Sequence, residues 1–131
     1  MTALRLAVVV LLLAHGVAHL VGFLVPWRLA TPPEMPYRTT VLGGAIDLGP
    51  TGIRLYGLLW LALGLAFAIA AGALVLRLPW WYRLTVIAAA WSLVMCVAGW
   101  PESRIGVAAN LVLLTLTIAG THAGWLPRAL P

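Results

Sequence analysis

Long apolar stretches alternate with short polar breaks along this chain. Four of the stretches carry almost no charge, and each approaches the roughly 20 residues that a helix needs to cross ~30 Å of hydrocarbon. Proline or Gly-Pro interrupts the pattern between them, as is typical of helix ends. We therefore expect helices at approximately 4–25, 53–76, 80–99 and 103–120. The predicted fold is an all-α, four-helix transmembrane bundle that forms a single integral membrane domain over residues 1–131.

The longest polar segment lies between the first two of these helices. Residues 37–42 and 45–48 are strand-like runs, and Gly43 and Gly44 separate them. Two such runs joined by glycines indicate a short β-hairpin-like linker. Because two isolated strands are marginally stable in water, we expect the hairpin to rest on the bundle end or the membrane surface, as a lid.

The composition fits a membrane protein, since 63% of the 131 residues are hydrophobic and 8% are charged. The net charge of +5 comes from scattered arginines rather than from a basic run interleaved with aromatics, so no nucleic-acid partner is expected. Membrane lipids are the expected partners, together with a homo-oligomer or partner membrane subunits. The single cysteine, Cys96, excludes an intrachain disulfide.

An even number of crossings places both termini on one side of the membrane. The arginine count does not decide the orientation: four lie on each side, namely Arg5, Arg77, Arg83 and Arg128 against Arg28, Arg38, Arg54 and Arg104. Every acidic residue lies on the second side, so the short turn on the first side is free of acids, and the long first linker also lies on the second side. We expect a multi-pass protein of the cell membrane with both termini cytoplasmic. The apolar stretch continues to Val25, which favours a retained first helix over a cleaved signal peptide.

Two histidines lie within the first predicted helix, where an unpartnered protonatable ring is costly and so marks a candidate site. Helical spacing places His15, Ala18, His19 and Gly22 on one face. Counting from the helix ends puts His19 and Asn110 both about 10 Å below one surface, with Ser92 near that level. Tyr56 caps the same end. The candidate ligand-binding residues are His15, His19, Ser92, Asn110 and Tyr56; no residue is assigned a catalytic role.

Three interpretations of the histidine pair remain open. In the first, each ring hydrogen-bonds a neighbouring helix through Ser92, Asn110 or a carbonyl and serves packing alone. In the second, His15 and His19 are two metal ligands, and Cys96, Asp47 or Glu102 supplies a third. A bis-histidine haem is disfavoured because both rings lie on one helix. In the third, the cluster lines a pocket for a lipid, quinone or other amphipathic molecule. The sequence identifies no cofactor.

Three sequence motifs of this chain are similar to those of a known group of proteins. They are the run from His15 to Phe23 (H-G-x-x-H-L-x-G-F), the run from Pro36 to Thr40 with Leu42-Gly43-Gly44, and Gly99-Trp100-Pro101-Glu102. Together they resemble a family of short four-helix integral membrane proteins of high-GC Gram-positive (actinobacterial-type) bacteria. This resemblance covers most of the chain and implies the same topology. No established function comes with it, and it transfers no catalytic residue and no ligand.

We expect a small integral membrane protein that is a non-catalytic lipid- or small-molecule-binding unit, or an accessory subunit of a membrane complex. One alternative is a metal- or haem-dependent membrane redox protein that uses His15 and His19. The other is a transporter or channel subunit. A polar path through one chain is not expected, but Gly57 and Gly64 could serve contacts between chains.

Overall fold

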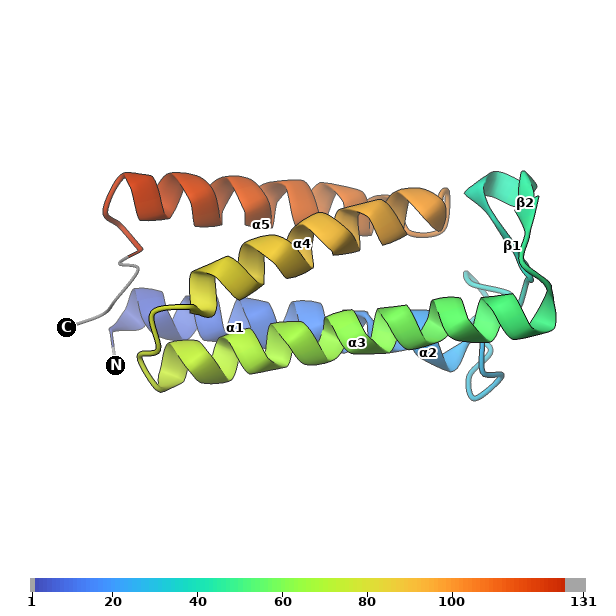
Figure 1. Cartoon of the computed structure of the whole chain (residues 1–131), viewed down its shortest axis with the longest axis horizontal. Helices are drawn as coiled ribbons and strands as arrows, with labels where there is room; N and C mark the ends of the chain where they lie inside the picture. Colours follow the sequence, from blue (N-terminus) through green and yellow to red (C-terminus); the bar gives the residue numbers. More distant parts are fainter. Residues whose placement is uncertain (1, 127–131) are drawn as a thin grey trace.

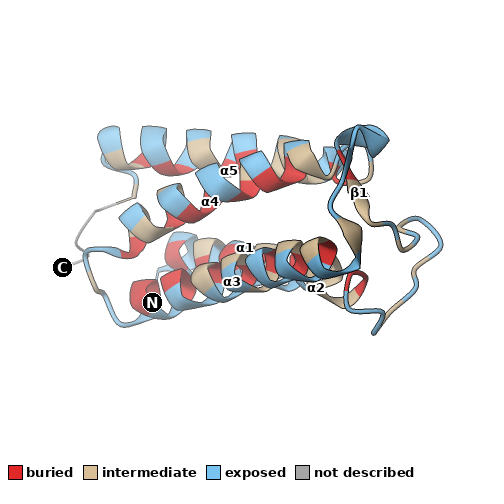
Figure 2. Cartoon of the chain, turned by 45° about the vertical axis from the view of Figure 1, so that its right-hand side comes forward, coloured by how far each residue is buried: buried red, intermediate tan, exposed pale blue. Residues whose placement is uncertain are grey.

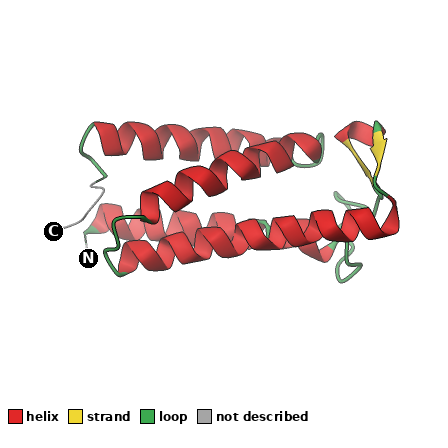
Figure 3. Cartoon of the chain, viewed as in Figure 1, coloured by secondary structure: helices red, strands yellow, loops and turns green. Residues whose placement is uncertain are grey.

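A computed structural model of the chain describes residues 2–126; Met1 and residues 127–131, including Arg128 of the expected charge count, lie outside the described residues. Within the described part, four helical segments are long and apolar enough to cross a membrane: Ala3–Leu24, Gly49–Val75, Trp81–Ala98 and Arg104–His122. They lie side by side in one bundle (Figure 1, Figure 3). The predicted fold class is confirmed, and the chain has the architecture of a multi-pass membrane protein.

The first spanning segment is two helices, α1 (Ala3–Ala18) and α2 (Leu20–Leu24), where the sequence predicts one. They meet at His19. The backbone N–H of His19 donates to the carbonyl of Gly16, 3.2 Å away. The His19 side chain hydrogen-bonds the carbonyl of His15 instead, with 2.8 Å between Nδ1 and that oxygen. A side chain that satisfies the helix backbone lets the helix tighten locally without leaving a carbonyl unpaired.

The predicted hairpin is present but short. Strand β1 (Thr40–Val41) pairs antiparallel with β2 (Ile46–Asp47), and the 3-10 turn η1 (Leu42–Gly44) joins them. Gly43 and Gly44 have φ values of 64° and 94°, which a residue without Cβ adopts without strain. The two glycines therefore define the turn, as the sequence indicated.

The hairpin lies at one end of the bundle, beside the turn between α4 (Trp81–Ala98) and α5 (Arg104–His122) (Figure 1). The backbone N–H of Gly43 donates to the carbonyl of Trp100 at 3.0 Å. Arg38 forms a salt bridge with Glu102, with 2.9 Å between Nη1 and Oε1. These contacts place the linker over the bundle end.

Helix α3 (Gly49–Val75) begins earlier than predicted. The sequence pattern placed Pro50 in the break before this helix, but Pro50 lies in the first turn of α3. The N–H that proline lacks would make no intrahelical bond at this position, so Pro50 is compatible with the helix start. The carboxylate of Asp47 accepts the N–H of Gly49 at 2.9 Å. At the other end of α3, the buried side chain of Arg5 donates to the carbonyls of Leu74 and Val75, where a helix C-terminus favours positive charge.

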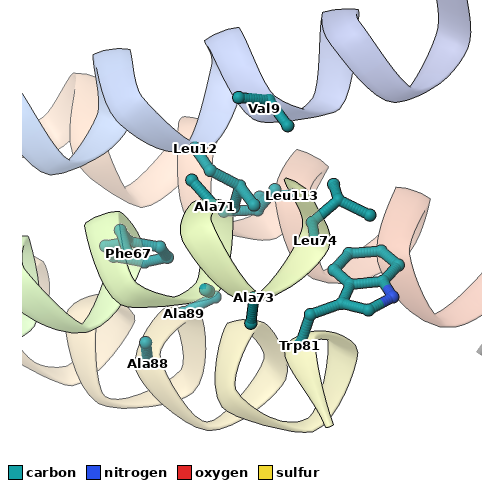
Figure 4. Close-up of a cluster of buried hydrophobic side chains, with 11 residues drawn as sticks. Val9, Leu12, Phe67, Ala71, Ala73, Leu74, Trp81, Ala88, Ala89 and Leu113 are labelled. Atoms are coloured by element: carbon teal, nitrogen blue, oxygen red, sulfur yellow. The ribbon is translucent and has the colours of Figure 1, made fainter. Parts of the chain in front are cut away.

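Buried residues lie on the faces where the helices meet, and exposed residues lie on the outer surface (Figure 2). Many of the exposed residues are large and apolar. The main core lies in the half of the bundle near the described chain ends. Figure 4 shows its centre, which includes Leu12, Phe67, Ala71, Leu74, Trp81, Ala89 and Leu113. A Cβ on Gly64 would lie 2.9 Å from the carbonyl oxygen of Gly16, so α1 and α3 cross with their backbones in contact. Gly16 and His19 cover Gly64, and Pro26 and Trp27 cover Gly57, so these two glycines lie inside one chain rather than at a contact between chains.

Candidate ligand-binding site

Four of the five predicted site residues form one hydrogen-bonded network across three helical segments. His15 Nε2 lies 3.0 Å from Asn110 Oδ1 of α5. His19 Nε2 lies 2.7 Å from Ser92 Oγ of α4. Asn110 Nδ2 donates to Ser92 Oγ at 2.8 Å and thereby closes the connection between the two histidines. His19, Ser92 and Asn110 are buried, and His15 is half-buried. The network joins the first helix to α4 and α5.

The orientation of the Asn110 amide follows from its backbone partner. Asn110 Nδ2 lies 2.8 Å from the carbonyl oxygen of Gly106, and a carbonyl only accepts. The nitrogen must therefore face Gly106 and Ser92, and the oxygen must face His15. An amide oxygen is an acceptor as well, so His15 Nε2 carries a proton and donates it.

The position of the proton on His19 follows from its hydrogen-bond partners in the same way. Its Nδ1 faces the carbonyl of His15 and therefore donates. In a neutral imidazole the other nitrogen is then an acceptor. Ser92 Oγ already accepts from Asn110 and donates its own proton to His19 Nε2. Every contact of the network is satisfied with both imidazoles neutral and in opposite tautomers.

A cavity of about 330 Å³ extends from the histidine pair to the hairpin. The face predicted from helical spacing forms one of its walls, because His15, Ala18, His19 and Gly22 all line it. Opposite them are Ile105, Gly106 and Ala109 of α5. The volume lies at the lower end of the range for small-molecule sites. Because α5 packs against α4 while α1 and α2 pack against α3, the cavity lies between two helix pairs.

Most of the side chains that line the cavity are apolar, among them Val25, Ile53 and Trp60. Arg38 and Glu102, which form the salt bridge described above, line the end beneath the hairpin. The cavity is thus bounded by imidazoles at the membrane-buried end and by an ion pair at the hairpin end.

Tyr56, the fifth predicted residue, also lines the cavity but does not join the histidine network. Its hydroxyl donates to the carbonyl of Met95 at 3.0 Å. Trp60, which sequence reasoning missed, stacks at a tilt on His19 with 5.2 Å between ring centroids. A Cβ on Gly22 would lie 2.4 Å from the Trp60 ring. In the sequence, Gly22 on the histidine face indicated that a neighbouring side chain packs closely there, but nothing identified that side chain as Trp60.

No group of three His, Cys, Asp or Glu side chains that could hold a metal ion is found within residues 2–126. Of the proposed third ligands, Cys96 lies in the network as a weak acceptor, 3.5 Å from Asn110 Nδ2. Asp47 accepts the N–H of Gly49 at the start of α3, and Glu102 pairs with Arg38. His19 would have to exchange its bond to Ser92 for a metal bond.

A comparison of the chain with protein-family models, with curated proteins and with solved structures finds no match.

Proposed function

We propose that this chain is a membrane protein that binds an apolar or amphipathic small molecule in the cavity between its two helix pairs. The observation that carries the proposal is the cavity itself, which has a volume of about 330 Å³, is lined mostly by apolar side chains, and reaches the imidazoles of His15 and His19 at its inner end. Such a combination of an apolar pocket with a few convergent polar groups is typical of ligand sites.

The position of the cavity supports a ligand that arrives from the membrane. Its wall includes Ala18 of the first helix and Ile105 of α5, and both residues are exposed on the outer surface of the helices. Side chains on that surface contact lipid in a spanning bundle. A molecule dissolved in the bilayer therefore has a short route between α1 and α5 into the cavity.

A binding function accounts for the cavity and the histidine network without a chemical reaction. His15 Nε2, His19 Nδ1 and His19 Nε2 all hydrogen-bond other groups of the protein, and these bonds fix the wall of the cavity. We include in this proposal the cell membrane as location and the cytoplasm as the side of both termini. The short turn on that side carries Arg77 and Arg83 without an acidic residue, and the long first linker lies on the other side.

Photolabelling tests the proposal. The full chain in lipid nanodiscs is irradiated with a long-chain alcohol that carries a diazirine on its tail, and the labelled residues are mapped by mass spectrometry. We expect adducts on cavity residues of α1, α2 and α5. Labelling spread evenly over the lipid-facing surface would contradict a binding site.

Two matched variants of α5 control this experiment. Ala109→Phe adds a ring within the cavity and should abolish specific labelling. Ala108→Phe adds the same ring at the neighbouring position, which is exposed and does not line the cavity. Equal loss of labelling in both variants would indicate damage to α5 and not occupation of the cavity.

A further inference from the structure

Three polar side chains at the inner end of the cavity share one property. The donor of each is already engaged within the protein. His15 Nε2 donates to Asn110, and His19 Nδ1 donates to the His15 carbonyl. The Tyr56 hydroxyl donates to the carbonyl of Met95. The inner cavity therefore offers a ligand few protons.

One further lining residue follows the same rule. The Ser103 hydroxyl donates to the carbonyl of Cys96 at 2.6 Å. The Trp60 ring lies against His19 and Tyr56, with 5.2 and 6.1 Å between ring centroids. The Cys96 thiol is only a weak donor. At the hairpin end of the cavity, the guanidinium of Arg38 donates to Glu102.

One strong acceptor, in contrast, is unused. His15 Nδ1 has no hydrogen-bond partner among residues 2–126. Within that range, Trp81 Nε1 is the one side-chain nitrogen or oxygen that is fully buried and has no hydrogen-bond partner. His15 Nδ1 also has no partner, so it is not fully buried and keeps accessible surface. Because Asn110 fixes the proton of His15 on Nε2, Nδ1 carries a lone pair.

We infer that the site selects molecules with a hydroxyl group, that is, apolar alcohols or phenols, whose O–H donates to His15 Nδ1. This inference rests on the proposed function and specifies its ligand class. A ketone, quinone, ester or ether offers only acceptors. It would place an oxygen lone pair against the lone pair of Nδ1 and leave both polar groups unpaired, which is costly in an apolar cavity.

A matched pair of ligands tests the inference in the full chain. Dodecanol and its methyl ether have the same tail and the same oxygen, but the ether has no proton to donate. Each competes with the photoreactive alcohol in nanodiscs, with its concentration expressed as mole fraction in the bilayer. We expect dodecanol to displace the label at about one-fifth of the ether concentration or less, as one hydrogen bond of ordinary net strength implies.

The variant His15→Phe keeps a ring of similar size and removes the acceptor. It should bring the two competitors to equal effectiveness, while His122→Phe, at the far end of α5, should preserve the difference. Histidine ¹⁵N spectra supply a second readout that needs no variant. Dodecanol should shift the Nδ1 resonance of His15, and the ether should leave it unchanged.

The outcomes separate the two proposals. If both competitors displace the label equally in the unaltered protein, and Ala109→Phe still abolishes labelling, the cavity binds ligands but the hydroxyl preference is overturned. If neither competitor displaces the label and the label maps to no site, the proposed function fails as well. A fivefold preference that persists in His15→Phe would also overturn the role of His15.

Discussion

Gly16 and Gly64 bring the backbones of α1 and α3 into direct contact. A Cβ built on Gly16 would lie 2.8 Å from the carbonyl oxygen of Gly64, closer than side-chain atoms approach a backbone. Small residues at such a crossing allow close packing in a membrane, where no hydrophobic effect drives helices together. This contact holds α1 in place, and with it the histidine face.

A larger residue at this crossing should destabilise the bundle. Gly64→Leu would force the helices apart, and overpacking of this kind costs about 1–3 kcal/mol. The free energy of unfolding, measured by steric trapping in bicelles, checks this value. Gly72→Leu is the matched control on the same helix, because a Cβ at Gly72 meets nothing within 4 Å. Equal destabilisation by the two substitutions would contradict the close crossing.

The bond between His15 and Asn110 should couple α1 to α5 energetically. In a double-mutant cycle of His15→Phe and Asn110→Leu, we expect a coupling on the order of 1 kcal/mol, within the range of interhelical hydrogen bonds in membranes. The cycle of His15→Phe with Thr115→Val is the control, since the Thr115 hydroxyl bonds only to its own helix at Leu111. A coupling as large in the control cycle would indicate nonspecific loosening.

The two histidines should have opposite tautomers in their neutral forms. His15 is expected with its proton on Nε2 and His19 with its proton on Nδ1, because Asn110 Oδ1 and the His15 carbonyl can only accept. Two-dimensional ¹⁵N spectra of histidine-labelled protein distinguish the tautomers directly. Ser92→Ala should move the Nε2 resonance of His19 and keep its proton on Nδ1. The same tautomer on both rings would show that the network is arranged differently.

Acid should loosen the start of α3. Hydrogen bonds from the Gly49 N–H and the Thr39 side chain hold the pKa of Asp47 below its usual value. A lowered pKa in the folded protein means that the carboxylate stabilises the fold above the pKa of an unfolded aspartate, and that this contribution disappears as pH falls through the lowered value. The protection factor of the Gly49 amide, which is its intrinsic exchange rate divided by its measured rate at the same pH, should therefore fall at low pH. In Asp47→Asn the exchange should lack this additional acid-dependent step.

Much of the fold could be read from the sequence. Uninterrupted apolar length determined four spanning helices, since the bilayer thickness sets the number of residues that a helix needs. Gly43 and Gly44 determined the hairpin turn. The helical period placed His15 and His19 on one face with Ala18 and Gly22, and this face lines the cavity.

Only the tertiary structure decided how these pieces meet. Periodicity gives the face of a helix but not the rotation of its neighbour, so Ser92 and Asn110 could be placed at the right depth without being assigned to a particular histidine. The sequence did not predict the break between α1 and α2 at His19, because this break depends on a hydrogen bond from the His19 side chain to a backbone carbonyl. A pocket at this cluster was one of the three interpretations, but its size and lining depend on how far the packing of α1 on α3 and of α5 on α4 separates α1 from α5.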